Sequence, residues 1–147
     1  MMKKTLPNDV LLGEVSRLVE TGETVALMAK GYSMLPFIVG GRDSVVLERP
    51  GELRIGMIVL SHVMGERYVL HRIIAIEDEK VTLMGDGNLK GVEICRRSDV
   101  KAVASRIITP SREIDCHGTK HQRRAAIWKR LLPVRRWILA VYRRVFL

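Results

Sequence analysis

Residues 67–86 contain two apolar runs separated by a short polar turn. They read Arg-Tyr-Val-Leu-His-Arg-Ile-Ile-Ala-Ile, then Glu-Asp-Glu-Lys, then Val-Thr-Leu-Met-Gly-Asp. Runs rich in β-branched residues on either side of such a turn are typical of an antiparallel β-hairpin. We therefore expect strands at 67–76 and 81–85.

Similar runs recur along the rest of the chain. Asn8 and Asp9 begin a predicted helix over residues 8–22, in which apolar residues recur at helical spacing until Gly22. Turn-forming Gly and Pro residues bound further predicted strands, at 24–30, 44–48, 57–63, 100–108 and 112–116. Many short strands behind one helix indicate a mostly β fold, a small and partly closed antiparallel β-barrel.

The charge of the chain is concentrated at one end. The 147 residues carry a net charge of +9, and with 47% hydrophobic and 28% charged residues they exclude wholesale disorder. All 16 acidic residues precede residue 116, whereas nine of the 25 basic residues lie in 120–147. We therefore predict one domain over 1–119, followed by a basic tail over 120–147.

The tail has the pattern of an amphipathic helix, with a kink expected at Pro133. At about 100° per residue its apolar side chains share an arc of roughly 140°. A basic amphipathic helix with aromatic residues is typical of a peripheral anchor on an anionic membrane surface. Packing against the barrel is an alternative, and nucleic-acid binding is the least favoured one. The predicted arc contains Trp128, Leu131, Leu132, Ile138, Leu139, Tyr142, Val145 and Phe146.

Several classes of protein are not expected. No apolar run approaches the roughly 20 residues that span a bilayer. Polar residues interrupt residues 1–20, so no cleaved secretion signal is expected either. Cys95 and Cys116 are too few for a disulfide framework or a four-ligand zinc site, even with His117 and His121 nearby. We expect no metal and no cofactor.

The register of the 67–86 hairpin brings a histidine close to a carboxylate. If Ile76 faces Val81, then His71 lies directly opposite Asp86, with their Cβ atoms about 4.5–5.5 Å apart. A turn of three or five residues would shift the register by one and separate the two. An imidazole oriented by a carboxylate is the base half of a catalytic triad. The structural alternatives are a core histidine and a turn-forming aspartate.

Ser33 is the candidate nucleophile. The segment Gly31-Tyr-Ser-Met-Leu-Pro36 marks the passage from a strand to a tight turn or the first turn of a helix. Backbone N–H groups at such a turn are free to form an oxyanion hole beside the serine. The alternative is that Ser33 only caps the turn.

These segments together resemble a known family. Gly31–Pro36, followed by Gly41-Arg-Asp-Ser-Val-Val46, is similar to the Ser-Met-x-Pro … Gly-Asp-x-Val box of type I signal peptidases and of their relatives, the self-cleaving SOS-response repressors. Val69-Leu-His-Arg-Ile-Ile74 resembles the box with the general base, which is His in the archaeal and endoplasmic-reticulum branch. Gly85-Asp-Gly-Asn88 resembles the third box, and Asp99-Val100 the closing strand. The resemblance covers roughly residues 24–108.

The resemblance implies a serine-type endopeptidase with the signal-peptidase catalytic fold, in which Ser33 attacks the peptide and His71 accepts its proton. The hairpin register favours Asp86 as the third catalytic residue, and Glu93 and Asp99 are the other candidates. Signal peptidases often have Ser or Thr at the position of Gly31, so backbone N–H groups must supply more of the oxyanion hole here. We expect Gly31, Met34 and Pro36 to form this hole or to bind substrate.

The implied substrate is an extended leader peptide or signal-like peptide. With no secretion signal, we expect the protein in the bacterial cytoplasm or, peripherally, on the inner face of the cytoplasmic membrane. The alternative is a catalytically impaired peptide-binding or membrane-binding module of the same fold.

Overall fold

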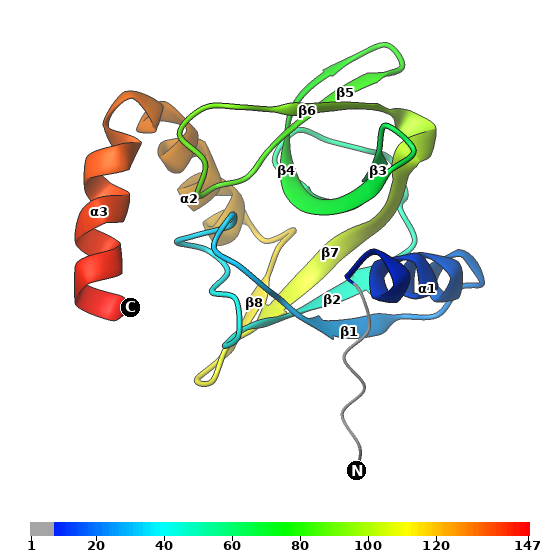
Figure 1. Cartoon of the computed structure of the whole chain (residues 1–147), viewed down its shortest axis with the longest axis horizontal. Coiled ribbons are helices and arrows are strands. Elements are labelled where there is room, and N and C mark those ends of the chain that lie inside the picture. The colour runs from blue at the N-terminus through cyan, green and yellow to red at the C-terminus, as the bar shows by residue number, and fades with distance from the viewer. Residues whose placement is uncertain (1–7) are drawn as a thin grey trace.

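The computed structural model describes residues 8–147, and their side chains from Val10 onward. Most of the chain forms antiparallel strands, with helices at both ends (Figure 1). The helices are α1 (Asn8–Glu20), α2 (Thr119–Arg130) and α3 (Arg135–Phe146), and the short 3-10 helices are η1 (Arg97–Asp99) and η2 (Leu132–Val134). The strands are β1 (Val25–Met28), β2 (Ser44–Glu48), β3 (Ile58–Val63), β4 (Arg67–Glu77), β5 (Lys80–Met84), β6 (Glu93–Arg96), β7 (Val100–Ile108) and β8 (Glu113–Asp115).

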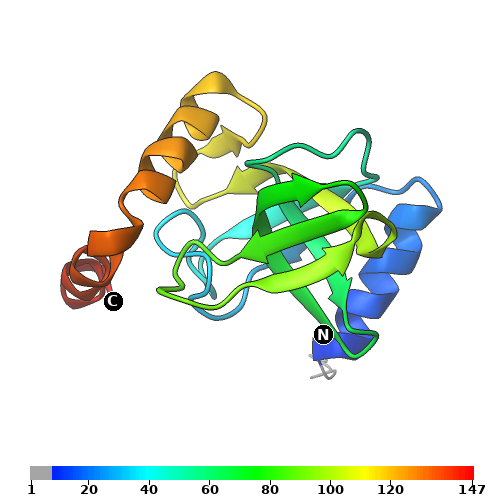
Figure 2. The ribbon, with the colours of Figure 1, turned by 90° about the horizontal axis from the view of Figure 1, so that it is seen from above.

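The strands form one curled antiparallel sheet. Their order is β1-β2-β7-β3-β4-β5-β6, and β8 pairs with the second half of β7. Irregularities in the β2–β7, β3–β7 and β4–β5 ladders each displace the register by one residue. Because such bulges bend a strand and increase its twist, the sheet curls into a half-barrel (Figures 1 and 2). The predicted mostly β architecture is confirmed.

The core lies on both sides of the curled sheet. α1 covers one region, where Leu12, Val15 and Val19 pack against buried residues of the sheet such as Leu47 and Leu60. A second cluster fills the inside of the curl with buried aliphatic side chains from β3, β4, β5 and β7. Because both faces of the sheet are covered, β3 is buried along almost its whole length, and this explains its continuous apolar run.

The basic tail folds as two helices, since η2 interrupts it around Pro133 as expected. The predicted single apolar arc is only partly correct. Trp128 and Leu139 are buried against Leu35 and Val39, with Leu131 and Tyr142 packed around them. Ile138, Val145 and Phe146 remain exposed. The two tail helices therefore pack against the half-barrel on one side and keep a separate apolar face outside.

None of the helices within residues 8–147 has both the length and the apolar character required to cross a bilayer.

Candidate active site

Ser33 lies in a tight turn over residues 31–37 that follows β1. The Leu35 N–H donates to the Tyr32 carbonyl (3.2 Å), and the Gly40 N–H donates to the Gly31 carbonyl (3.1 Å). Gly31 itself has a φ of +71°, a conformation that glycine adopts without strain. Ser33 is half-buried at the mouth of the pocket described below.

The backbone around Ser33 has unused hydrogen-bond donors. Among the described residues, neither the Ser33 N–H nor the Met34 N–H donates to another protein group. The Met34 side chain is buried and its sulfur accepts the Asp86 N–H (3.4 Å). Pro36 completes the turn but does not line the pocket. The turn therefore presents two adjacent amides beside a hydroxyl, as an oxyanion hole requires.

The Gly85–Asn88 loop holds this turn in place. The Gly87 N–H donates to the Ser33 carbonyl (2.8 Å). A Cβ atom at Gly85 would lie 2.4 Å from the Ser33 carbonyl oxygen, and one at Gly87 would lie 2.4 Å from the Tyr32 carbonyl oxygen. The glycines are therefore required by the close approach of two backbone segments that are more than 50 positions apart in sequence.

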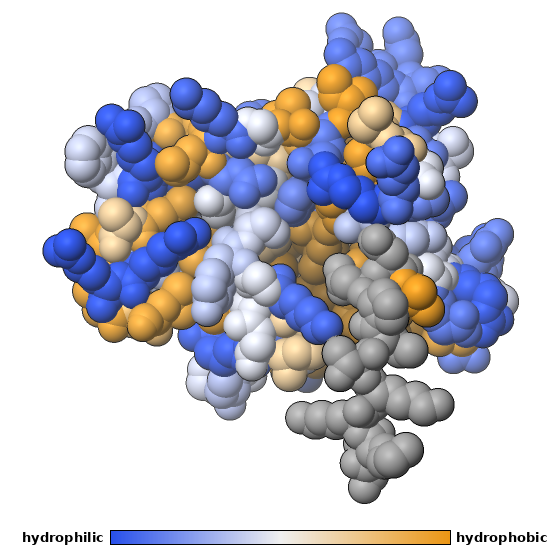
Figure 3. All heavy atoms as spheres, in the orientation of Figure 1, coloured by the Kyte–Doolittle hydropathy of each residue, from blue (hydrophilic) through white to orange (hydrophobic). Residues whose placement is uncertain are grey.

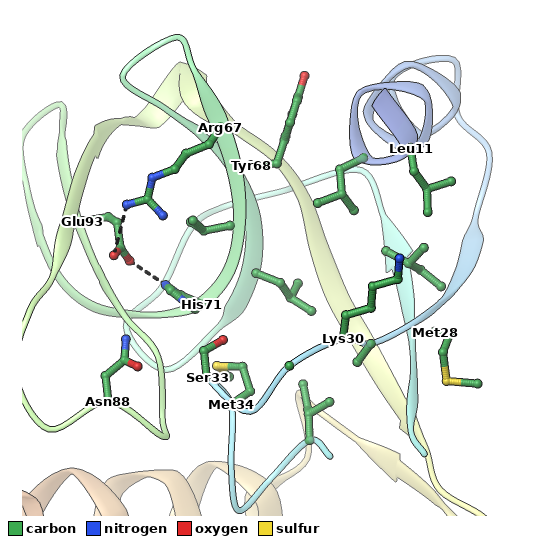
Figure 4. Close-up of a pocket in the computed structure, with 17 residues that line it drawn as sticks. Leu11, Met28, Lys30, Ser33, Met34, Arg67, Tyr68, His71, Asn88 and Glu93 are labelled. Carbon is green, nitrogen blue, oxygen red and sulfur yellow. Dashed lines mark hydrogen bonds and ion pairs between the residues drawn. The ribbon is translucent and has the colours of Figure 1, made fainter. Parts of the chain in front are cut away.

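His71 pairs with Glu93. Its Nδ1 lies 2.5 Å from Glu93 Oε1, and the imidazole is buried, with 7% of the residue exposed (Figure 4). Arg67 Nη2 lies 3.6 Å from the second Glu93 oxygen. Because β5 separates β4 from β6, the two residues are two strand spacings apart, roughly 9.5 Å. The long Glu side chain spans this gap.

The expected contact between His71 and Asp86 is wrong. The β4–β5 ladder begins in the predicted register, with Glu77 opposite Lys80 and Ile76 opposite Val81. An irregularity between Ile73 and Ala75 then shifts the register by one residue, so that Arg72 faces Met84. Asp86 no longer lies opposite His71.

Asp86 instead forms a buried ion pair with Arg72. Arg72 Nε donates to Asp86 Oδ1 (2.9 Å) and Nη2 donates to Oδ2 (2.7 Å). Arg72 also donates to the Gly56 carbonyl and stacks on the Phe37 ring at 4.9 Å. The third candidate, Asp99, accepts the Arg96 N–H (2.9 Å) at the start of η1. Of the three candidate acids, the structure brings only Glu93 to His71.

Ser33, His71 and Glu93 line one pocket of about 430 Å³. Figure 4 shows the Ser33 side chain on the same side of the pocket as His71, with Glu93 on the other side of the imidazole. Lys30 also lines the pocket, but its amine points away from Ser33, toward Leu11 (Figure 4). In the part of the chain that the structure describes, no hydrogen bond joins Ser33 Oγ to His71.

The residues around Cys116 have structural contacts. Arg72 Nη1 donates to His121 Nε2 (3.2 Å), and the His121 ring packs edge-on against Phe37. Burial, together with the Arg72 charge, lowers the pKa of His121 to about 4. Burial raises the pKa of the Cys116 thiol to about 12. Among residues 8–147 no group of His, Cys, Asp and Glu side chains is arranged to hold a metal ion.

Several residues of the site carried no signal in the sequence. β6 was not predicted, because Glu-Ile-Cys-Arg is short and has charged residues at both ends. Arg67 and Asn88 line the pocket but were not predicted to do so, although Asn88 is part of the third box. Arg72 stands next to His71 in the second box, and only the register shift makes it the partner of Asp86.

No protein family, curated protein or solved structure gives a significant match to the chain. The resemblance to signal peptidases therefore rests on the four sequence boxes alone.

Proposed function

We propose that the chain is a serine endopeptidase of the signal-peptidase type, with Ser33 as nucleophile, His71 as general base and Glu93 as the residue that orients His71. One observation carries the proposal. A hydroxyl with free neighbouring amides shares a pocket with a buried imidazole that is already paired with a carboxylate. These are the three parts that acyl transfer by a serine needs.

The chemistry follows from the orientation of His71. Its Nδ1–H donates to the Glu93 carboxylate, which leaves Nε2 as the nitrogen that accepts a proton. Ser33 Oγ attacks the peptide carbonyl carbon while its proton passes to Nε2. The proton then moves to the departing amine as the C–N bond breaks and an ester forms on Ser33. Water, deprotonated by the same imidazole, hydrolyses the ester and restores Ser33.

The oxyanion formed in this reaction lies beside the amides of Ser33 and Met34. Gly31 offers no side-chain hydroxyl, so these backbone donors carry the charge of the intermediate. Removal of one such donor typically costs about 2.7–4 kcal/mol of transition-state stabilisation. We infer an enzyme that works with a hole of two backbone amides.

The surroundings of Ser33 support an extended peptide as substrate. β1 is an edge strand of the sheet, and the segment from Leu27 to Gly31 lines the pocket on the way to Ser33. A peptide that pairs with this edge gains backbone hydrogen bonds and passes its carbonyl groups over the nucleophile. Apolar side chains such as Leu12 and Ile38 line the same pocket and suit small apolar residues of the substrate.

Covalent labelling tests the proposal. The wild-type protein is incubated with a serine-directed phosphonylating probe, and the modified residue is located by peptide mass spectrometry. We expect modification of Ser33, which Ser33→Ala abolishes and His71→Ala strongly slows. Ser98→Ala, which removes an exposed serine on η1, should label like the wild type. Labelling that does not depend on His71 would defeat the assignment of the base.

A catalytically impaired peptide-binding module is the second candidate. The observation that favours it is the missing hydrogen bond between Ser33 Oγ and His71 within residues 8–147. In serine hydrolases this contact often tightens only when substrate binds. Such a module would bind an extended peptide with equal affinity as wild type and as Ser33→Ala, and would neither cleave it nor react with the probe.

A further inference from the structure

α3 has one face that packs inward. Arg135 and Leu139 are buried, and Leu139 and Tyr142 contact the cluster formed by Leu35, Val39 and Trp128. Arg135 donates to the carbonyl groups of Asn88 and Trp128. This side of α3 is therefore fixed to the half-barrel by apolar packing and hydrogen bonds, and the rest of the helix stands outside it (Figures 1 and 2).

The outward side of α3 is apolar. Trp137, Val141 and Val145 are 63, 63 and 66% exposed, and Ile138 beside them is 37% exposed. Residues four apart on a helix are neighbours, so these side chains form one continuous strip, called here the outer row. Figure 3 shows hydrophobic surface over α3, crossed by hydrophilic side chains. Within residues 8–147 none of the buried hydrophobic clusters includes a residue of this row.

Positive charge lies beside the outer row. Residues 120–147 contain nine basic residues and no acidic residue. Arg136 and Arg144 are exposed and lie on α3 along the same flank of the row, and the Arg136 guanidinium lies 4.8 Å from the centre of the Trp137 ring. A partner for this face must therefore offer both an apolar interior and negative charge at its surface.

We propose that the outer row of α3 docks into the surface of a bilayer that contains anionic lipids. Trp137 and the aliphatic side chains enter the boundary between headgroups and acyl chains, while Arg136 and Arg144 contact the lipid phosphates. A second copy of the chain fits this face poorly, because it would bring like charges together. Nucleic acid supplies the charge but no apolar environment for Val141 and Val145.

Vesicle binding tests this proposal with the full-length protein. Flotation is compared between vesicles of phosphatidylcholine alone and vesicles of equal parts phosphatidylcholine and phosphatidylglycerol. We expect binding to the anionic vesicles only, with a blue shift of tryptophan emission that Trp137→Phe removes. Binding to both vesicle types alike, or to neither, would overturn the proposal.

Variants separate the apolar and the electrostatic contributions. The double variant Val141→Asp/Val145→Asp should bind anionic vesicles at least about tenfold more weakly, since two carboxylates then face the lipid phosphates. Arg144→Gln should weaken binding by about fivefold, and high salt should reduce the difference. Val10→Asp is the control, because it adds one carboxylate of the same kind at an exposed position of α1, at the opposite end of the molecule (Figure 1).

Two further measurements distinguish the outcomes. Ser33→Ala should bind vesicles like the wild type, so that a failure of the peptidase proposal leaves this result unchanged. Light scattering and a filter-binding assay with duplex DNA are run on the same variants. If Val141→Asp/Val145→Asp dissociates an oligomer, or lowers DNA binding while vesicle binding stays intact, the face serves another partner and the membrane assignment is wrong.

Discussion

At the scale of single residues, the two carboxylates near the pocket have different partners. Glu93 contacts the imidazole of His71 and remains close to solvent, whereas Asp86 neutralises the buried guanidinium of Arg72. A carboxylate that orients a base contributes to the reaction, and one that neutralises a buried cation contributes to folding. The two residues should therefore respond to substitution in opposite ways.

Glu93→Gln should impair the proposed reaction more than the fold. The amide keeps the size of the side chain, but it no longer fixes the tautomer of His71 or stabilises the imidazolium. In a serine triad this loss lowers the rate by up to roughly ten-thousandfold. The measurement is the rate of probe labelling at Ser33, with Glu66→Gln, an exposed position, as control. Labelling at the wild-type rate would remove Glu93 from the site.

Asp86→Ala should impair the fold. It leaves the Arg72 guanidinium buried without its counter-ion, which typically costs about 3–5 kcal/mol of unfolding free energy. Urea unfolding measures this loss. Glu113→Ala is the matched control, since it breaks the exposed pair with Arg106, and exposed pairs contribute only about 0–1 kcal/mol. Equal effects of the two substitutions would contradict the buried ion pair.

At the scale of elements, the contact between the Ser33 turn and the Gly85–Asn88 loop makes its own prediction. Gly87→Ala would place a methyl group 2.4 Å from the Tyr32 carbonyl oxygen, so the two segments must separate. We expect reduced labelling of Ser33 and a lower melting temperature. Gly51→Ala, where a Cβ atom meets nothing within 4 Å, should change neither.

The hairpin shows how far the sequence predicts the candidate site. Strand positions and the turn register followed from apolar runs and a polar turn, and they are correct through Ala75 opposite Thr82. The bulge at Ile74 has no sequence signature, because residues 73–76 contain three isoleucines and no Gly or Pro to mark it. One displaced residue was enough to exchange the predicted partner of His71.

The acidic partner of His71 was harder to predict because it comes from a strand that the sequence does not mark. β6 pairs with the edge of β5 that β4 leaves open. Whether a short segment with a charged residue at each end joins a sheet depends on the tertiary structure and not on local propensity. Glu93 was thus a candidate for the third catalytic residue only because it follows the third box closely in sequence, and no predicted strand pairing placed it near His71.

At the scale of the whole molecule, the helices of the tail hold the loop beside the candidate site in place by hydrogen bonds. Trp128 Nε1 donates to the Asp86 carbonyl (2.7 Å), Arg135 donates to the Asn88 carbonyl (3.0 Å), and His121 accepts from Arg72. α2 and the start of α3 therefore bind the far side of the loop that holds Ser33. From residue 120 onward the surface of the chain is basic, but the helices of this segment still pack against the half-barrel.

Because neutral His121 accepts a hydrogen bond from Arg72 in this interface, the free energy of unfolding depends on pH. The pKa of His121 in the folded state, about 4, lies below the usual value near 6.5, so below pH 6.5 the unfolded chain binds this proton more readily. The contribution of neutral His121 to the free energy of unfolding is fully present above about pH 6.5. It is lost as the pH falls toward 4, and the total loss amounts to roughly 3 kcal/mol.

Urea unfolding of wild type and His121→Gln between pH 4 and 7 measures the effect. Glutamine can still accept from Arg72 but does not titrate in this range, so the unfolding free energy of the variant should fall less steeply on acidification. Ser111→Ala, an exposed position that carries no titratable group, should retain the wild-type slope. If the unfolding free energies of wild type and His121→Gln fall in parallel with pH, protonation of His121 does not destabilise the interface between the tail and Arg72.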